Sequence, residues 1–581
     1  MAGKEVREDI LEYVRENKLS PFSSSKTQVK EKQGLEIFKT KDAKTVFNRV
    51  ISQISNYFSF SDTSNILKFF KFTEDTREIE KRQEFFKKIK WQDNSFLKEL
   101  KTPKQFWKPK YNVVVVTSDE KTFVQLQKLE CPVQFINSQD DVSGLEDYDI
   151  VQVIDCGDFS GLLEQLPQAV FLDSADEVYL ERYLTILSGW KNNLEILVKN
   201  KTNEDIEKIV TQLAPLLKYI EDQPFEKLTR EHVESKLDGI NEYVSSEMKK
   251  ITLSGENLFA MLHAGKMPAE VEQIVEKAIE QSKIPPHLFK PSIPVAIDEQ
   301  ELASHMKKQD SEEFTKVVES VKKQVEMLSS IPKKLQELSD CLVYYDFVAG
   351  ISGFMANAKD FPILADEFSF YGAKNVFLDD KAQPISFLLD EKNKCSMLTG
   401  ANSGGKTTLI EHIIQLITLL QIGLPVNGKV KIPVFTEVYY FAKTKGSTSK
   451  GAFENLLTQM SSIKPGKKTL ILADEIEAVT EPGVASRIIG ATAEYFIEKG
   501  CFLVVATHLG QEIQKNLPKY SRIDGIEAKG LDEKHELIVD HNPVLGKLAN
   551  STPELIVEKL ASSKKQDYFK FLNEMLKKGK K

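Results

Sequence analysis

A glycine-rich turn at residues 400–407, GANSGGKT, carries the side chains best suited to chemistry. Its spacing matches G-x-x-x-x-G-K-[ST], in which glycines let the backbone turn tightly and aim several N–H groups at phosphate oxygens. The apolar residues that follow predict a helix, whose N-terminal end favours the same anion. Lys406 is placed to reach the β- and γ-phosphates, and the Thr407 hydroxyl to hold Mg²⁺. The pattern predicts a nucleotide-phosphate site.

Two further apolar runs end in residues that complete such a site. The run TLILA at 469–473 predicts a strand that ends in Asp474 and Glu475. The aspartate can hold Mg²⁺ through water, and the glutamate can polarise an attacking water. The run CFLVVA predicts another strand, ending in Thr507 and His508, where the histidine can contact the γ-phosphate or the water.

Each of these features has a structural explanation when taken alone. The glycine-rich turn can be a chance match, the acidic pair an ordinary charged turn, and the histidine a structural residue. Their order along the chain favours an ABC-type ATPase, a class in which two facing domains sandwich each nucleotide. Hydrolysis in that class implies a dimer. The transporter-type motif LSGGQ does not occur in the sequence.

An α/β domain is expected to position these residues. Strand and helix patterns alternate from about residue 366, and the strand CSML at 395–398 precedes the glycine-rich turn. We expect this domain to span 366–560, followed by a basic helical tail at 561–581. The tail is either a solvated end or a contact for a partner or a phosphate.

The remaining chain predicts three further segments. Residues 1–105 indicate helices with a polar break, and 106–175 a small α/β module with strands near 112–116, 132–137, 149–156 and 168–174. Residues 176–365 indicate long helices interrupted by the proline-rich loop 283–294. These helices form either a bundle or a pair of long antiparallel arms, and the sequence leaves both open.

Composition narrows the class of protein. At roughly 100–200 residues per domain, 581 residues predict three to five domains. The net charge of −8 argues against a basic surface over the whole chain, although a local basic stripe would suffice for nucleic acid. No apolar run reaches the roughly 18 residues of a membrane helix, and five scattered cysteines indicate reduced thiols. We therefore expect a cytoplasmic protein with no membrane partner.

Several motifs resemble the MutS family of DNA mismatch-repair ATPases. TGANSGGKTT has the family's T-G-x-N-x-G-G-K-[ST]-T form, and TLILADEI and VVATHLGQEI resemble its metal-binding and histidine strands. GLPVNGKVKIPVFTEVYY at 423–440 and GKLANSTPELIVEKLA at 546–561 resemble later parts of the family's ATPase domain. The resemblance is strongest over about 338–560, and is weaker over 18–60.

The resemblance implies a multidomain α and α/β fold: a helical core and lever arms, followed by an ABC-type P-loop ATPase domain. It implies ATP and Mg²⁺ as cofactors, with Thr407 and Asp474 on the metal and Glu475 and His508 as catalytic residues. The residues expected to bind the nucleotide are Gly400, Asn402, Gly404, Gly405, Lys406, Thr407 and Thr408. The family's adenine-stacking aromatic falls near Pro384, so Ile385 is its expected apolar substitute.

The sequence departs from the family pattern in three places. DEIEAVTEPG replaces the usual D-E-I-G-R-G-T, and STSKGAFENLLTQM replaces the segment that acts on the partner's nucleotide. Ser449 or Gly451, in the stretch up to Phe453, is the expected group acting in trans. The Phe-x-Glu motif of mismatch readers is not seen in its family context near the N-terminus.

These departures indicate a short branch that lacks the mismatch-recognition domain and the C-terminal nuclease-like domain. The function implied is a homodimeric ATPase that clamps DNA, structure-specific rather than mismatch-specific, in repair or recombination. The alternative is a ribosome- or RNA-associated ATPase of the same family.

Overall fold

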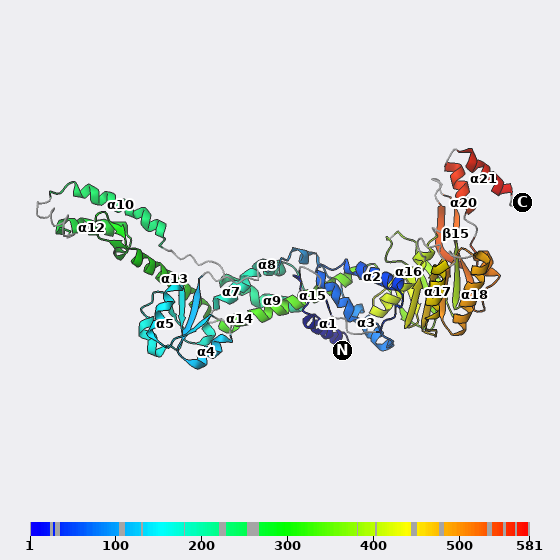
Figure 1. The fold of residues 1–581 in the computed structure, drawn as a ribbon, viewed down its shortest axis with the longest axis horizontal. Coiled ribbons are helices and arrows are strands. Elements are labelled where there is room, and N and C mark those ends of the chain that lie inside the picture. Colours follow the sequence, from blue (N-terminus) through cyan, green and yellow to red (C-terminus); the bar gives the residue numbers. More distant parts are fainter. Residues whose placement is uncertain are drawn as a thin grey trace. The chain divides into compact units, whose positions relative to one another are not determined.

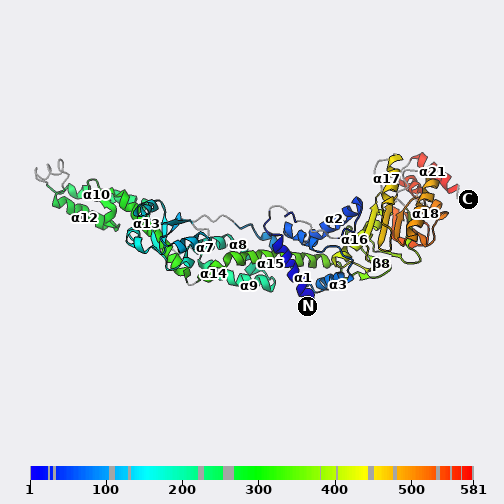
Figure 2. The same cartoon turned by 60° about the horizontal axis from the view of Figure 1, so that its bottom comes forward.

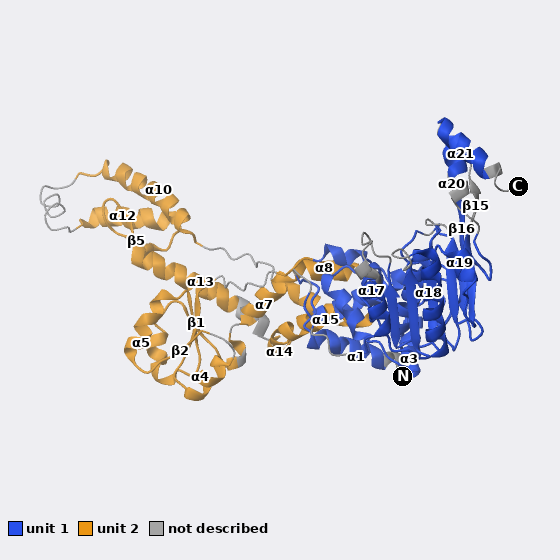
Figure 3. Ribbon diagram, turned by 45° about the vertical axis from the view of Figure 1, so that its right-hand side comes forward, with its two compact units in different colours: residues 1–100, 339–581 blue, residues 101–338 orange. Residues whose placement is uncertain are grey.

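The computed structural model divides the chain into two compact units (Figure 3). Unit 1 contains residues 1–100 and 339–581, and unit 2 contains residues 101–338. The structure describes residues 2–23, 27–29, 35–103, 111–128, 132–178, 180–219, 228–252, 267–322, 324–379, 381–400, 404–442, 450–475, 481–531, 537–549, 553–563 and 566–578. Mixed helix and parallel sheet, which we expected from the sequence, is confirmed.

The main sheet of unit 1 has the strand order β12-β13-β14-β10-β15-β16 (Figure 1). Its pairs are parallel except for the antiparallel β15–β16 hairpin. The strands are β10 (Cys395–Gly400), β12 (Glu437–Phe441), β13 (Thr469–Asp474), β14 (Phe502–Ala506), β15 (Ser521–Leu531) and β16 (Leu537–Leu545). The predicted strands before the glycine-rich turn, the acidic pair and the histidine are thus confirmed as β10, β13 and β14.

Helices cover both faces of this sheet. Leu470 and Leu472 of β13 pack in one cluster with α16 (Lys406–Ile422), and Ile471 packs in another with α18 (Pro482–Glu498). Alternate side chains of a strand point to opposite faces, so α16 and α18 lie on opposite sides of the sheet. The remaining helices of this part are α17 (Lys450–Ser461), α19 (Gly510–Gln514), α20 (Pro553–Ser563) and α21 (Asp567–Lys578), the last confirming a helical tail.

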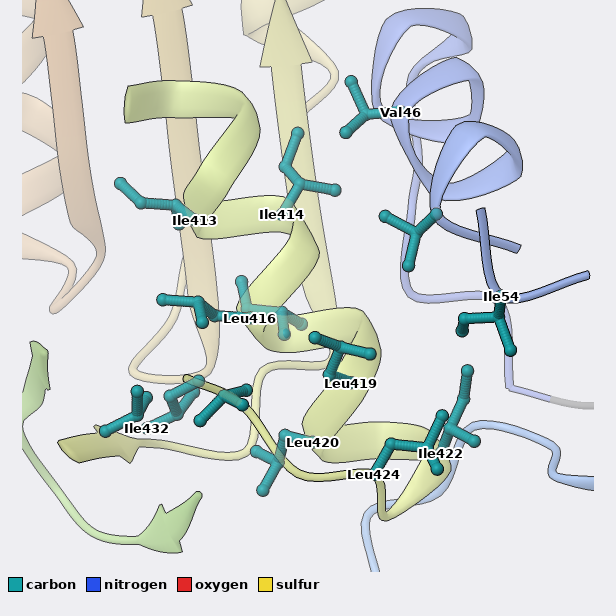
Figure 4. Close-up of a cluster of buried hydrophobic side chains, with 14 of the residues drawn as sticks. Val46, Ile54, Ile413, Ile414, Leu416, Leu419, Leu420, Ile422, Leu424 and Ile432 are labelled. Atoms are coloured by element: carbon teal, nitrogen blue, oxygen red, sulfur yellow. The ribbon is translucent and has the colours of Figure 1, made fainter. Parts of the chain in front are cut away.

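The N-terminal helices of unit 1 pack against α16. In one buried cluster, Val46 of α2 lies beside Ile414 of α16, and Ile54 of α2 lies near Leu419 and Ile422 (Figure 4). The far end of α16 is held by α3, where Arg82 donates to the carbonyl of Gln421 at 2.7 Å. The N-terminal helices are α1 (Ala2–Glu16), α2 (Lys41–Ser55), η1 (Ser61–Phe69), α3 (Thr76–Lys87) and η2 (Ser95–Glu99). α15 (Ile331–Met355) adds side chains to the same buried cluster, and its first residues belong to unit 2.

One part of the expected polar break between N-terminal helices joins the sheet instead. Phe38 forms a parallel bridge with Val438 of β12, and Lys39 N–H donates to the Val438 carbonyl at 2.9 Å. Ile37 and Phe38 are buried. An edge strand such as β12 has backbone groups without a partner strand. The backbone of Ile37 and Lys39 hydrogen-bonds to these groups at Val438, while the side chains of Ile37 and Phe38 are buried. A second sheet of unit 1, in the order β7-β11-β8-β9, contains β7 (Ile363–Leu364), β8 (Phe368–Ala373), β9 (Ile385–Leu389) and β11 (Lys429–Ile432).

Unit 2 begins with a four-stranded parallel sheet in the order β2-β1-β3-β4. Its strands, β1 (Val113–Thr117), β2 (Val133–Phe135), β3 (Ile150–Val153) and β4 (Ala169–Phe171), lie where the sequence predicts them. The short helices between them are α4 (Glu120–Gln127), α5 (Gln139–Ser143), η3 (Gly144–Asp147), η4 (Gly157–Phe159), α6 (Ser160–Leu163) and η5 (Ala175–Glu177).

The rest of unit 2 is helical, and α10 and α12 lie side by side over a shared apolar core (Figure 2). The helices are α7 (Leu180–Gly189), α8 (Lys191–Lys199), α9 (Glu204–Leu213), η6 (Ala214–Tyr219), α10 (Arg230–Met248), α12 (Ala269–Ser282), α13 (Glu299–Lys322) and α14 (Val325–Ser329). The proline-rich stretch 283–294, expected to be a loop, contains η7 (Pro286–Leu288) and β5 (Phe289–Lys290), which pairs with β6 (Ala296–Ile297) just after the stretch. Of the helices described, none has the length and apolarity needed to span a membrane.

Candidate functional site

The carboxyl ends of three neighbouring parallel strands form the centre of the site. β14 lies between β10 and β13, so the histidine strand separates the strand before the glycine-rich turn from the strand before the acidic pair. Thr507 N–H donates to the Leu398 carbonyl at 2.9 Å, and Glu475 N–H donates to the Ala506 carbonyl at 2.9 Å. Ligands bind at such carboxyl ends in open α/β sheets.

Glycine is required at both ends of the turn. Gly400 has φ +133°, and a Cβ there would lie 2.4 Å from the Ile526 carbonyl oxygen of β15. Gly405 has φ +94° and occupies the N-cap position of α16. Both conformations are ones that only glycine adopts readily. The predicted residue Asn402 lies outside the described residues, whereas Gly404 and Thr408 are described and flank the start of α16.

Lys406 points into this turn and towards the acidic pair. Its side chain is 3% exposed, and its Nζ donates to the Gly400 carbonyl at 2.7 Å. The same Nζ lies 3.8 Å from Glu475 Oε1. A buried ammonium group that bridges a glycine-rich turn and a carboxylate is a strong local source of positive charge in an otherwise acidic cluster.

Thr407 and Asp474 meet on the other side of Lys406. The Thr407 hydroxyl donates to Asp474 Oδ2 at 2.6 Å, and Asp474 is buried. A hydroxyl and a carboxylate oxygen are the hard ligands that Mg²⁺ prefers. The negative charge of Asp474 also contributes to raising the pKa of the neighbouring Tyr440, after burial of that phenol, which is the larger cause.

Glu475 and His508 form a close side-chain contact in the site. His508 Nε2 lies 2.5 Å from Glu475 Oε1; the glutamate is buried, whereas the histidine side chain is 37% exposed. The backbone of Glu475 has φ +50°, a left-handed conformation that costs of order 1–3 kcal/mol for a residue other than glycine. Such strain is retained where surrounding contacts fix the residue, and it clusters at functional sites.

The remaining predicted residues lie elsewhere. Ile385 begins β9 in the second sheet and is buried in the large core cluster, with no direct contact to Lys406 or Glu475 recorded among the described residues. Gly451 lies in the first turn of α17, and Ser449 lies outside the described residues. The structure therefore brings together Gly400, Gly404, Gly405, Lys406, Thr407, Asp474, Glu475 and His508.

Sequence reasoning missed His541, whose Nδ1 lies 2.9 Å from the Gly404 carbonyl. It also missed the buried Asp524 of β15, which accepts from the Ser396 hydroxyl at 2.6 Å beneath the turn. Neither residue belongs to a motif, and both come from a hairpin more than 100 residues after the turn. The only signal was the position of Asp524 between the apolar residues Ile523 and Ile526 of β15.

The chain is 29% identical to the DNA-binding protein MutS2 of Pyrococcus furiosus, over 93% of this chain and 99% of that protein. It is 27% identical to the Endonuclease MutS2 of Aquifex aeolicus over 35% of this chain, and 26% identical to the DNA mismatch repair protein MutS of Thermotoga maritima over 36%.

The chain has homologues among the MutS2 and MutS proteins. The matches to the Aquifex and Thermotoga proteins cover only 28% and 27% of their lengths, so those similarities are local. No protein-family model matches the chain.

Proposed function

We propose that the chain is a Mg²⁺-dependent ATPase of the ABC type, in the short branch of MutS-like proteins. The observation that carries this proposal is the meeting of Lys406, Glu475 and His508 with the Thr407–Asp474 pair at the carboxyl edge of one parallel sheet. The branch assignment rests on the Pyrococcus relative, which this chain matches along nearly its whole length. The ATPase domain would comprise residues 366–560, and the helical core and lever arms would include 176–365.

The donor groups fit ATP and Mg²⁺. The turn from Gly400 to Gly405 and the N-terminus of α16 suit phosphate oxygens, and Lys406 supplies a fixed positive charge. Thr407 and Asp474 would hold the metal, with Asn402 and Thr408 completing the phosphate contacts and Ile385 packing on the base. Bound Mg²⁺ would neutralise charge on the phosphates during transfer.

Glu475 is the group placed to accept a proton from the attacking water. Its carboxylate lies 3.8 Å from Lys406 Nζ and contacts His508, and its backbone N–H donates to the Ala506 carbonyl. His508, which is partly exposed, can contact the same water or the γ-phosphate. Lys406 would move from Glu475 towards phosphate oxygens when the nucleotide binds, and this frees the carboxylate for its role as a base.

The proposed assembly is a homodimer in the cytoplasm, and the proposed partner is DNA of a particular structure. Support for DNA comes from the name of the Pyrococcus relative. Local support comes from unit 1, where Trp91 is 72% exposed and follows the exposed Lys88 and Lys90 in the chain. ATP would set clamp opening if DNA binds the two nucleotide states with different affinity. In the proposed homodimer, a group in the segment 449–453 would complete the nucleotide site of the other protomer.

Steady-state ATP hydrolysis tests this proposal. The purified protein would be assayed with duplex, mismatched and four-way-junction DNA and with ribosomes, all at one salt concentration, because phosphate contacts depend strongly on salt. We expect turnover that junction DNA changes more than matched duplex does, and a Lys406→Ala variant that neither binds nor hydrolyses ATP. Unchanged ATP affinity in that variant would contradict the site. ATP turnover that responds to ribosomes and to no DNA would identify the ribosome as the partner in place of DNA. The ATPase assignment would remain unchanged.

A further inference from the structure

Lysines gather where the parallel strands of the main sheet of unit 1 begin, at the end of the strands opposite the nucleotide site. Four short segments lead into β13, β14, β10 and β15 there, and we call them together the amino edge: residues 462–468, 499–501, 390–394 and 515–520. They contain eight lysines and two acidic residues, whereas the whole chain has a net charge of −8. The amino edge is therefore a local positive surface on an acidic protein.

Short contacts hold the four segments side by side. The Lys394 carbonyl accepts from the N–H of Leu503 in β14 at 2.9 Å, and the Tyr520 carbonyl accepts from the first N–H of β10 at 3.2 Å. A Cβ added to Gly500 would lie 3.1 Å from Lys467 Cγ. Neighbouring strands lie about 4.8 Å apart, so the segments before β13, β14, β10 and β15 form a row about 14 Å long.

The charges of the amino edge are available to a partner. Seven of its eight lysines are exposed, and Lys394 is half-buried. Among the residues that the structure describes, Lys468 is the only one of the eight with an ion-pair partner, Glu74 at 2.9 Å. Ion pairing within unit 1 therefore leaves most of this positive charge facing solvent.

Helix ends explain only part of this cluster. Lys499 and Lys515 follow the last turns of α18 and α19, where a cation offsets the negative end of the helix dipole. Lys392 follows the strand β9, and Lys467 lies well beyond the end of α17, so neither has this role. The remaining charge points to an anionic partner.

Tyr520 adds an aromatic side chain to the same edge. It is 60% exposed, although it directly precedes the core strand β15. Its backbone has φ +61°, a left-handed conformation that residues other than glycine rarely adopt. A tyrosine hydroxyl, like a lysine, donates to the phosphate oxygens of DNA.

We propose that the amino edge binds the phosphate backbone of duplex DNA. Each strand of a duplex has one phosphate per ~3.4 Å of helix axis, so a row about 14 Å long faces about four phosphates. Lysine contacts with phosphate read no bases, in keeping with a protein that is not mismatch-specific. The inference rests on the proposed DNA partner, and it adds a surface on unit 1 to the proposed lever arms of unit 2.

A triple variant of the full chain tests this surface. Lys467→Ala, Lys499→Ala and Lys519→Ala remove one charge each from the segments before β13, β14 and β15. We expect matched duplex to bind at least tenfold more weakly at about 0.1 M salt, and the slope of log affinity against log salt to fall by roughly 2–3, since each lost phosphate contact contributes about 0.9. Fluorescence anisotropy of a labelled duplex measures both quantities. Kd for ADP should not change, because the nucleotide site lies at the other edge of the sheet.

The matched control removes the same charge from other parts of unit 1. Lys41→Ala, Lys98→Ala and Lys570→Ala change exposed lysines of α2, η2 and α21, and none of them belongs to the amino edge. This control should bind the duplex as wild type does. Thermal melts followed by circular dichroism check the folding of both triple variants without any ligand.

Other results would overturn the inference. Unchanged duplex affinity and salt slope in the amino-edge variant would do so and would leave the proposed DNA partner standing. An equal loss in the control would show an effect of overall charge, with no special role for this edge. A loss of ribosome binding in place of duplex binding would overturn DNA as the occupant. A wild type that binds no DNA would overturn both proposals.

Discussion

At the scale of single residues, the structure makes its most specific prediction for Glu475, the proposed general base. It is buried, held by His508 at 2.5 Å and fixed in a left-handed backbone conformation. Replacing it with glutamine preserves its size and its hydrogen-bonding capacity but removes the group that accepts a proton. We expect Glu475→Gln to bind ATP with near wild-type affinity and to lower kcat by roughly 10²–10⁴-fold, the range for a general base.

Single-turnover hydrolysis and equilibrium ATP binding would separate these two effects. Glu481→Gln is a matched control, since Glu481 is exposed and its side chain makes no cap bond at the start of α18. Trapped ATP should also stabilise the proposed homodimer, which sedimentation can detect. Normal turnover in the Glu475 variant would remove the residue from the proposed chemistry.

The sequence allowed us to predict site residues that directly follow a core strand. It did not allow us to predict site residues that a distant hairpin brings to the site. Asp474 and His508 each follow an apolar run, so parallel strands bring them to one edge. The meeting of His541 with Gly404 depends on the register of an antiparallel hairpin with two shifts along its length. Local sequence does not specify such a register, because packing of distant segments decides it.

At the scale of elements, α16 links the site to the N-terminal helices. Lys406 begins it at the glycine-rich turn, and at its other end the Gln421 side chain exchanges hydrogen bonds with the Thr73 backbone at 3.0 and 3.1 Å. The helix itself was predictable from its apolar spacing. The burial of α16 on almost every side could not be predicted, because its partner helix α2 lies more than 300 residues earlier in the chain.

His412 in the middle of α16 makes this helix sensitive to acid. Burial lowers the pKa of His412 from 6.5 to about 4, although the nearby Lys374 backbone acts in the opposite direction. The ring packs against Phe370, with ring centroids 5.3 Å apart. The folded state therefore holds the neutral form, while the unfolded chain takes up a proton as pH falls below 6.5.

Stability linked to His412 is present above pH 6.5 and is lost as pH falls towards 4. We expect wild-type protein to lose about 2 kcal/mol more unfolding free energy between pH 7 and pH 5 than His412→Leu does. Urea titrations of both proteins at the two pH values would measure this difference. Each protein's stability at pH 5 is compared with its own stability at pH 7, so packing lost in the variant does not affect the difference. Equal losses in the two proteins would show that His412 is accessible to protons in the folded state.

At the scale of the whole molecule, unit 2 can be separated from the nucleotide site. Unit 1 contains the sheet, the site and its own core, and unit 2 is inserted between residues 100 and 339 (Figure 3). The ends of the insertion are anchored near each other within unit 1. The rings of Phe96 and Tyr345 are 6.0 Å apart, and Tyr345 donates to the Asp93 carbonyl at 2.9 Å. A short flexible linker can therefore replace residues 101–338.

If the proposed lever arms bind DNA, this replacement should lower junction-DNA affinity at least tenfold and abolish the effect of DNA on ATP turnover. ADP affinity should stay close to wild type, because every described contact of the site lies in unit 1, and it serves as the control for folding. Fluorescence anisotropy at one salt concentration measures the DNA affinity. Retained DNA affinity would contradict DNA binding by the lever arms and would place the nucleic-acid surface on unit 1. Besides the amino edge, the first candidate there would be the exposed Trp91, which follows Lys88 and Lys90, since an aromatic ring next to lysines can stack on bases while the lysines contact phosphates.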